Sequence, residues 1–119
     1  MSNPTTSRRL TVALDWTPNT NHTGFYVAKA KGWFAEEGLD VIFKSPSDFE
    51  GSYSGSLSDD AAKVFPTPCH SVASGQADFG INSPEGCVGW NSPEKDSTRK
   101  TKLVAGTKKY FNLLIILFS

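Results

Sequence analysis

The stretch LDWTPNTNHTGFYVAKAKGWFAEEGLDV, from Leu14 to Val41, joins the end of one apolar run to the start of another. Its first part is a polar loop, and its second part has the spacing of apolar residues that is typical of an amphipathic helix. Thr23 can cap a helix that runs to about Glu37. Its core face is expected to carry Phe25, Ala28, Trp33 and Val27, and its solvated face Lys29, Lys31 and Glu36. Gly38 is then expected to end that helix, because glycine adopts the left-handed cap conformation without strain.

The two runs that flank this stretch predict strands. Residues 10–14 (LTVAL) are mainly apolar and β-branched, which is typical of a strand buried in a parallel sheet. Residues 39–44 (LDVIFK) alternate apolar and charged side chains over most of their length. A strand, a helix and a strand in this order predict a right-handed βαβ crossover. The predicted fold class is therefore α/β, with a short, mainly parallel sheet.

The rest of the sequence predicts further helices and strands. Residues 61–74 are expected to be helical in two pieces, because two prolines would break one continuous helix. Residues 77–81 predict a third strand, and Ser83 followed by proline and glutamate is a favourable helix start. Residues 102–105 predict a fourth strand. The apolar run 113–118 predicts either an additional strand or an exposed, adhesive tail.

A loop rich in Ser, Gly and Asp is predicted over residues 45–60. Its aromatic residues Phe49 and Tyr53 either close over a ligand or anchor the loop to the core, and we favour the second interpretation.

Composition and charge narrow the possible partners. Twelve basic and twelve acidic side chains leave no net charge, which argues against nucleic acid and membrane surfaces. Cys69 and Cys87 fit no zinc or disulfide spacing and are predicted to be reduced thiols. The first residues lack the apolar segment of a secretory leader, so a cytoplasmic location is expected, with a transit peptide as the alternative. Composition predicts no oligomeric state.

Residues 14–41 and the later segment SGQADFGINSPEG (residues 74–86) resemble a family of substrate-binding proteins that handle the pyrimidine precursors of thiamine. This family includes binding proteins of bacterial importers and the thiamine pyrimidine synthases. The resemblance covers residues 10–105. It rests on several residues that recur together at fixed spacing: Leu14 to Pro18, His22, Gly32, Phe34, Gly38, Leu39, Gly75 and Asp78.

The resemblance implies a type II periplasmic-binding architecture, in which two α/β lobes enclose a ligand. Residues 10–105 would form part of the first lobe, after a flexible N-terminus (residues 1–9) and before an atypical apolar tail (residues 106–119). We therefore expect a truncated member of the family. A gene fragment without independent function is a further hypothesis.

Ligands in open α/β sheets bind beyond the carboxyl ends of the strands, where the polar loop and the turn after the third strand are expected. A flat aminopyrimidine needs an aromatic face and a few fixed hydrogen-bonding groups. From composition alone Trp16 would more often be a core residue, and Asp15 is as well suited to capping its own turn. The predicted ligand-binding residues are Asp15, Trp16, Asn19, Asn21, His22, Asn82, Ser83 and Glu85.

An enzyme related to the synthases is the alternative function. The resemblance implies that a synthase would carry a lysine that holds pyridoxal phosphate at position 82 and a histidine that is consumed as substrate at position 86. This sequence has Asn82 and Gly86, and neither side chain can do that work. We therefore predict a protein that binds a small aminopyrimidine without catalysis, with no catalytic residues, cofactor or metal site.

Overall fold

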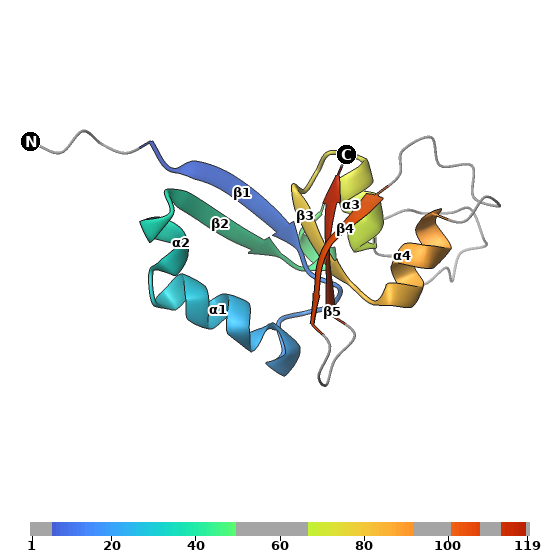
Figure 1. The fold of residues 1–119 in the computed structure, drawn as a ribbon, viewed down its shortest axis with the longest axis horizontal. Helices are drawn as coiled ribbons and strands as arrows, with labels where there is room; N and C mark the ends of the chain where they lie inside the picture. The colour runs from blue at the N-terminus through green and yellow to red at the C-terminus, as the bar shows by residue number, and fades with distance from the viewer. Residues whose placement is uncertain (1–5, 50–66, 92–100, 108–112, 119) are drawn as a thin grey trace, which may run out of the picture.

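The computed structural model describes residues 6–49, 67–91, 101–107 and 113–118 (Figure 1). The elements are β1 (Arg8–Ala13), η1 (Thr20–His22), α1 (Thr23–Ala30), α2 (Trp33–Glu36), β2 (Leu39–Lys44), η2 (Pro46–Asp48), α3 (Pro68–Ala73), β3 (Phe79–Asn82), α4 (Pro84–Asn91), β4 (Thr101–Thr107) and β5 (Leu113–Phe118). In this described part of the chain, no helix has the length and apolar character needed to cross a membrane.

The strands form one sheet in the order β2-β1-β3-β5-β4. β1 pairs in parallel with both β2 and β3, whereas β5 runs antiparallel to β3 and β4. Four strands therefore point the same way and β5 alone points the other way. The predicted α/β class and the mainly parallel sheet are confirmed, as expected for part of a periplasmic-binding-like fold.

β1 and β2 follow the expected strand, helix and strand order. β2 has the predicted bounds, whereas β1 begins at Arg8, two residues earlier than predicted. The parallel register places Leu10 beside Val41. Gly38 has a φ of 72° and directly precedes β2, so the prediction of a left-handed glycine at this helix end is confirmed.

The prediction of one continuous helix from Thr23 to Glu37 is wrong. The chain forms two helices, α1 and α2, because Gly32 between them has a φ of 78°, which is outside the helical region. Trp33, which follows Gly32, was expected in the core, but its side chain is 54% exposed. The left-handed residue turns the chain, so the helical spacing of the first segment does not extend through the second.

The helices α1 and α2 cover one face of the sheet, on the side of Phe43 in β2 (Figure 1). Three rings pack against Phe43, with centroid distances of 6.2 Å for Phe25, 4.9 Å for Tyr26 and 6.4 Å for Phe34. Lys29 was expected on a solvated helix face. Lys29 is indeed exposed, and its Nζ also donates a 2.6 Å hydrogen bond to the carbonyl of Val41.

Helix α3 covers the opposite face of the sheet. Thr67 caps its first turn by accepting a hydrogen bond from the backbone N–H of His70, and Pro68 occupies the first helical position. Gly80 allows α3 to approach β3 closely, because a Cβ at this position would lie 3.1 Å from Pro68 and 3.2 Å from Val72. The predicted first piece of this helix, residues 61–66, lies outside the described residues.

The buried core between α3 and the sheet includes Ala13, Phe49, Val72 and Ala77. Phe49 is only 7% exposed, so the interpretation that it anchors its loop to the core is confirmed. Tyr53, the other aromatic residue of that predicted loop, lies outside the described residues.

The motif Gly75-x-x-Asp78 has a structural role. Gly75 has a φ of 80° just after α3, a conformation that side-chain-bearing residues rarely adopt. Asp78, just before β3, is bonded to Thr11 of β1: its carboxylate accepts a 2.8 Å hydrogen bond from the backbone N–H of Thr11, and its own N–H donates to the Thr11 carbonyl. The motif therefore connects the end of α3 to β1.

The predicted fourth strand is β4, which extends over residues 101–107. The apolar run 113–118 forms β5, so the alternative of an additional strand is the correct one. β5 lies between β3 and β4, with Gly80 paired to Ile116 and Leu103 also paired to Ile116. This strand links the parallel part of the sheet to β4.

Candidate functional site

The candidate site lies at the edge of the sheet where β1, β2 and β3 all end. These neighbouring strands are parallel, so their carboxyl ends meet at one edge. The polar loop of residues 14–22 follows β1, and the turn of residues 82–83 follows β3. The two predicted groups of site residues therefore share this edge, on adjacent strands.

His22 and Asp15 are the central pair of the polar loop. The Nε2 atom of His22 lies 2.8 Å from Oδ1 of Asp15, and the His22 side chain is completely buried. The Nδ1 atom of His22 accepts a hydrogen bond from the backbone N–H of Asn19, at 3.2 Å. Because Nδ1 accepts, the proton of the neutral ring is on Nε2, which donates it to the carboxylate. Both ring nitrogens thus hold the loop together.

The two asparagines of the loop are both exposed, but they have different roles. The side-chain oxygen of Asn19 accepts from the backbone N–H of Asn21 at 2.9 Å, and its amide donates to the carbonyl of Thr17 at 3.0 Å. Asn19 thereby caps η1, together with His22. Asn21 is exposed. Asn19 shapes the loop, and Asn21 presents its side chain to solvent.

Trp16 is the most exposed aromatic side chain of the loop. It is 62% exposed, so the alternative of a core tryptophan does not hold. An exposed indole lies immediately after Asp15, whose carboxylate is fixed by the buried His22. The sequence therefore places a stacking surface on a loop segment whose base is held by the chain's own hydrogen bonds.

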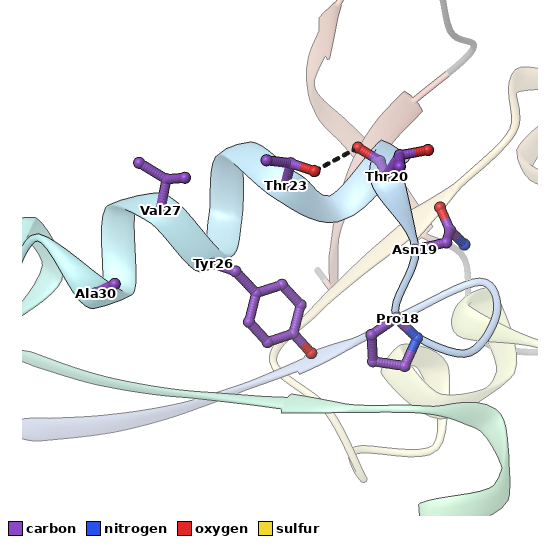
Figure 2. Close-up of a pocket in the computed structure, with 7 residues that line it drawn as sticks. All are labelled: Pro18, Asn19, Thr20, Thr23, Tyr26, Val27 and Ala30. Carbon is purple, nitrogen blue, oxygen red and sulfur yellow. Dashed lines mark hydrogen bonds between the residues drawn. The ribbon is translucent and has the colours of Figure 1, made fainter.

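An open groove of about 580 Å³ is lined by residues of the loop and of α1 (Figure 2). Figure 2 shows the rings of Pro18 and Tyr26 side by side at one part of this groove, while Thr23 donates a 2.8 Å hydrogen bond to the carbonyl of Thr20. The lining residues are Pro18, Asn19, Thr20, Thr23, Tyr26, Val27 and Ala30.

Most of these lining residues were not predicted to belong to the site. Thr23, Tyr26, Val27 and Ala30 have the spacing i, i+3, i+4 and i+7, which is one face of a helix. That spacing was available in the sequence, but Val27 was considered for the core face together with Phe25. The structure places Val27 on the groove, 40% exposed.

The turn after β3 is held by Asn82 and Ser83. The Asn82 side-chain oxygen accepts from the backbone N–H of Ser83 at 2.9 Å, and its amide nitrogen lies 3.3 Å from Sγ of Cys69. Oγ of Ser83 accepts from the backbone N–H of Gly86 at 3.2 Å, so the predicted helix cap is confirmed. The side chain of Glu85, also predicted for the site, is not among those that the structure describes.

Gly86 lies directly against the side chain of Asn82. A Cβ atom at position 86 would be 2.5 Å from Nδ2 and 2.8 Å from Oδ1 of Asn82, so the Asn82 side chain would have to move to admit it. The residues at positions 82 and 86 are therefore matched to each other. Within the described residues, no three His, Cys, Asp or Glu side chains gather as a metal site would require.

Comparison with known proteins shows that part of this chain is similar to a known family. Residues 19–61 match the family described as NMT1/THI5 like. Over this part of the chain, the predicted resemblance to a thiamine-pyrimidine-binding, periplasmic-binding-like family is confirmed.

Two curated proteins show the same similarity over a short stretch. The formylaminopyrimidine-binding protein of Halalkalibacterium halodurans is 57% identical over 37 residues, which is 31% of this chain and 11% of that protein. The riboflavin-binding protein RibY of Chloroflexus aurantiacus is 42% identical over 38 residues, which is 32% of this chain and 11% of that protein. Both relatives are small-molecule binding proteins, and the matches span about a ninth of their length.

Proposed function

We propose that this protein binds a small aminopyrimidine precursor of thiamine and does not catalyse its conversion. The proposed binding surface is the loop that carries Asp15, Trp16, Asn19, Asn21 and His22, together with the adjoining groove and the turn at Asn82, Ser83 and Glu85. The partner is a small molecule, and neither nucleic acid nor a membrane is part of the proposal.

One observation carries the proposal: an exposed Trp16 follows a carboxylate that a fully buried histidine holds at 2.8 Å. This pair, in which His22 is buried and Asp15 is partly exposed, fixes the base of the loop before any ligand arrives. The exposed indole then offers a flat face, and neighbouring Asn21 offers both donors and an acceptor. These are the groups that a flat nitrogen heterocycle requires.

The names of the two relatives support this ligand class. Formylaminopyrimidine and riboflavin are both flat nitrogen heterocycles with polar edges. The higher identity is to the formylaminopyrimidine-binding protein, which favours the smaller ring. The open groove lined by the later residues of the loop offers the apolar surfaces of Pro18 and Tyr26 on which such a ring can pack.

The alternative of a synthase-like enzyme that uses pyridoxal phosphate has less support. The Asn82 side-chain oxygen accepts a hydrogen bond from the backbone N–H of Ser83, and its nitrogen donates one to Sγ of Cys69. An amide side chain cannot form the Schiff base that pyridoxal phosphate requires. Position 86 is a glycine, which has no imidazole that could be consumed as substrate. The cytoplasmic location, the truncation and the hypothesis of a gene fragment stay predictions.

Thermal unfolding of the purified chain with different ligands tests the proposal. A ligand that binds only the folded state stabilises it by about 2.7 kcal/mol at a hundred times its dissociation constant. We expect formylaminopyrimidine to raise the melting temperature, and riboflavin and pyridoxal phosphate to raise it less. A shift with pyridoxal phosphate alone would favour the enzyme, and no shift with any of the three would contradict the proposal.

A further inference from the structure

Two cysteines lie behind the turn at Asn82, and the proposed binding function uses neither of them. Cys69 on α3 is only 1% exposed, and Cys87 on α4 is half-buried; both are free thiols. Sγ of Cys69 lies 4.0 Å from the carbonyl oxygen of Gly86, the residue that immediately precedes Cys87. The sequence separates the two cysteines by a strand and a turn, and the fold brings them together.

The environment of Cys87 agrees with this proximity. Burial raises the pKa of Cys87 from its ordinary value of 9.0 to about 12, and the nearby Cys69 contributes to that increase. The 4.0 Å distance from Sγ of Cys69 to the carbonyl oxygen of Gly86 carries the inference that the two cysteines are close, and the raised pKa supports it.

We propose that Cys69 and Cys87 form a reversible intramolecular disulfide that joins α3 to α4 when the protein meets hydrogen peroxide. One thiolate attacks the peroxide, which gives a sulfenic acid and releases hydroxide. The second thiol then attacks that sulfur, forms the S–S bond and expels water. In total, two thiols and one peroxide molecule give one disulfide and two water molecules.

The disulfide would act on the turn that belongs to the candidate site. The bond closes a loop of roughly 19 residues, from Cys69 to Cys87, and this loop contains β3 and the Asn82 turn. The Asn82 amide, which lies 3.3 Å from Sγ of Cys69, would then face a disulfide sulfur in place of a thiol. Oxidation therefore fixes the position of α4 relative to β3 and α3.

The oxidation is expected to be slow at neutral pH. The thiolate is the reactive form, and a thiol with a pKa of about 12 is almost completely protonated at pH 7. Cys69 is nearly inaccessible to solvent, so the reaction begins at the half-exposed Cys87. We expect conversion over hours with millimolar peroxide, in contrast to the rapid reaction of a sensor cysteine.

The test uses the complete chain, treated with hydrogen peroxide under native conditions at low protein concentration and then unfolded in a thiol-reactive reagent. The expected result is a fall from two free thiols to none, a mass loss of two hydrogen atoms, and a peptide map that joins residues 69 and 87. The oxidised protein should melt on the order of 10 °C higher, and a dithiol reductant should reverse the change.

Single variants Cys69→Ser and Cys87→Ser are the controls, because each retains one thiol and cannot form the internal bond. They should show no peroxide-dependent rise in melting temperature. Sulfinic or sulfonic acids without a disulfide, disulfides only between chains, or two thiols that persist in the wild-type protein after prolonged oxidation would each overturn the proposal. The wild-type measurements decide the question even if a variant does not fold.

Discussion

Nε2 of the fully buried His22 lies 2.8 Å from Oδ1 of Asp15, across the base of the loop that presents Trp16. This pair connects the stability of the loop to its binding surface. The carboxylate accepts a hydrogen bond from Nε2, and Nδ1 accepts one from the backbone N–H of Asn19, so His22 is bonded to two other positions of the loop. The loop is ordered by contacts within the chain, and its exposed side chains are left for a partner.

The hydrogen bond between Asp15 and His22 can be tested with two substitutions of the same carboxylate. Asp15→Ala leaves the buried Nε2 proton without an acceptor and should lower the free energy of unfolding by about 1–3 kcal/mol. Asp15→Asn keeps an oxygen at this position and should cost less than about 1 kcal/mol. Urea denaturation measures both values. Equal losses in the two variants would mean that the acceptor oxygen does not hold His22.

Two glycines of the same helical segment should respond in opposite ways to alanine. Gly32 has a φ of 78°, so Gly32→Ala should destabilise the protein by about 1–2 kcal/mol. Gly24 is in α1, and a Cβ there would meet no atom within 4 Å, so Gly24→Ala should stabilise by about 0.5–1 kcal/mol. Thermal unfolding compares them. A stabilising Gly32→Ala would show that α1 and α2 form one continuous helix.

The contact between Gly86 and Asn82 predicts non-additive effects. Gly86→Ala places a Cβ 2.5 Å from the Asn82 amide and should cost about 1–3 kcal/mol, because the side chain must move away from its partners. In the background of Asn82→Ala the same substitution should cost clearly less, since the colliding atoms are gone. A double-mutant cycle by denaturant unfolding measures the difference, and strict additivity would contradict the contact.

The raised pKa of Cys87 predicts that the protein loses stability in alkaline solution. Its pKa is raised to about 12 in the folded protein, from an ordinary value of 9.0, so above pH 9 the unfolded chain releases this proton first. The stability that the group contributes is complete below pH 9 and falls as the pH rises toward 12. Cys87→Ser removes the ionisation, so its stability should fall less steeply over this range. Parallel curves for the two proteins would contradict the raised pKa.

The sequence was sufficient to predict the parallel strands and the glycine caps, because these depend on local patterns. The strands β1, β2 and β3 follow apolar runs, and Gly38 and Ser83 act where helix caps were expected. The break at Gly32 was missed, because a glycine within a helical pattern resembles one that a helix tolerates. The environment of Trp33 was misjudged as a consequence.

The internal partners within the candidate site were beyond sequence reasoning. His22 is buried and bonded to Asp15 because η1 folds back toward the end of β1. No periodic pattern in the sequence predicts this change of direction. The contact between Cys69 and Cys87 likewise arises from the packing of α3 against α4, over a separation in sequence that fits no known motif. Side-chain type indicated which residues to consider, and tertiary structure determined their partners.

The most direct test of the account compares the binding of formylaminopyrimidine to the wild-type chain and to two tryptophan variants by calorimetric titration. Trp16 and Trp33 are similarly exposed, at 62% and 54%, but only Trp16 belongs to the loop at the carboxyl edge of the sheet. We expect Trp16→Ala to weaken binding at least tenfold and to change the melting temperature little, and Trp33→Ala to bind as the wild type does. Equal affinities for the wild type and Trp16→Ala would contradict the assignment of this loop as the binding surface.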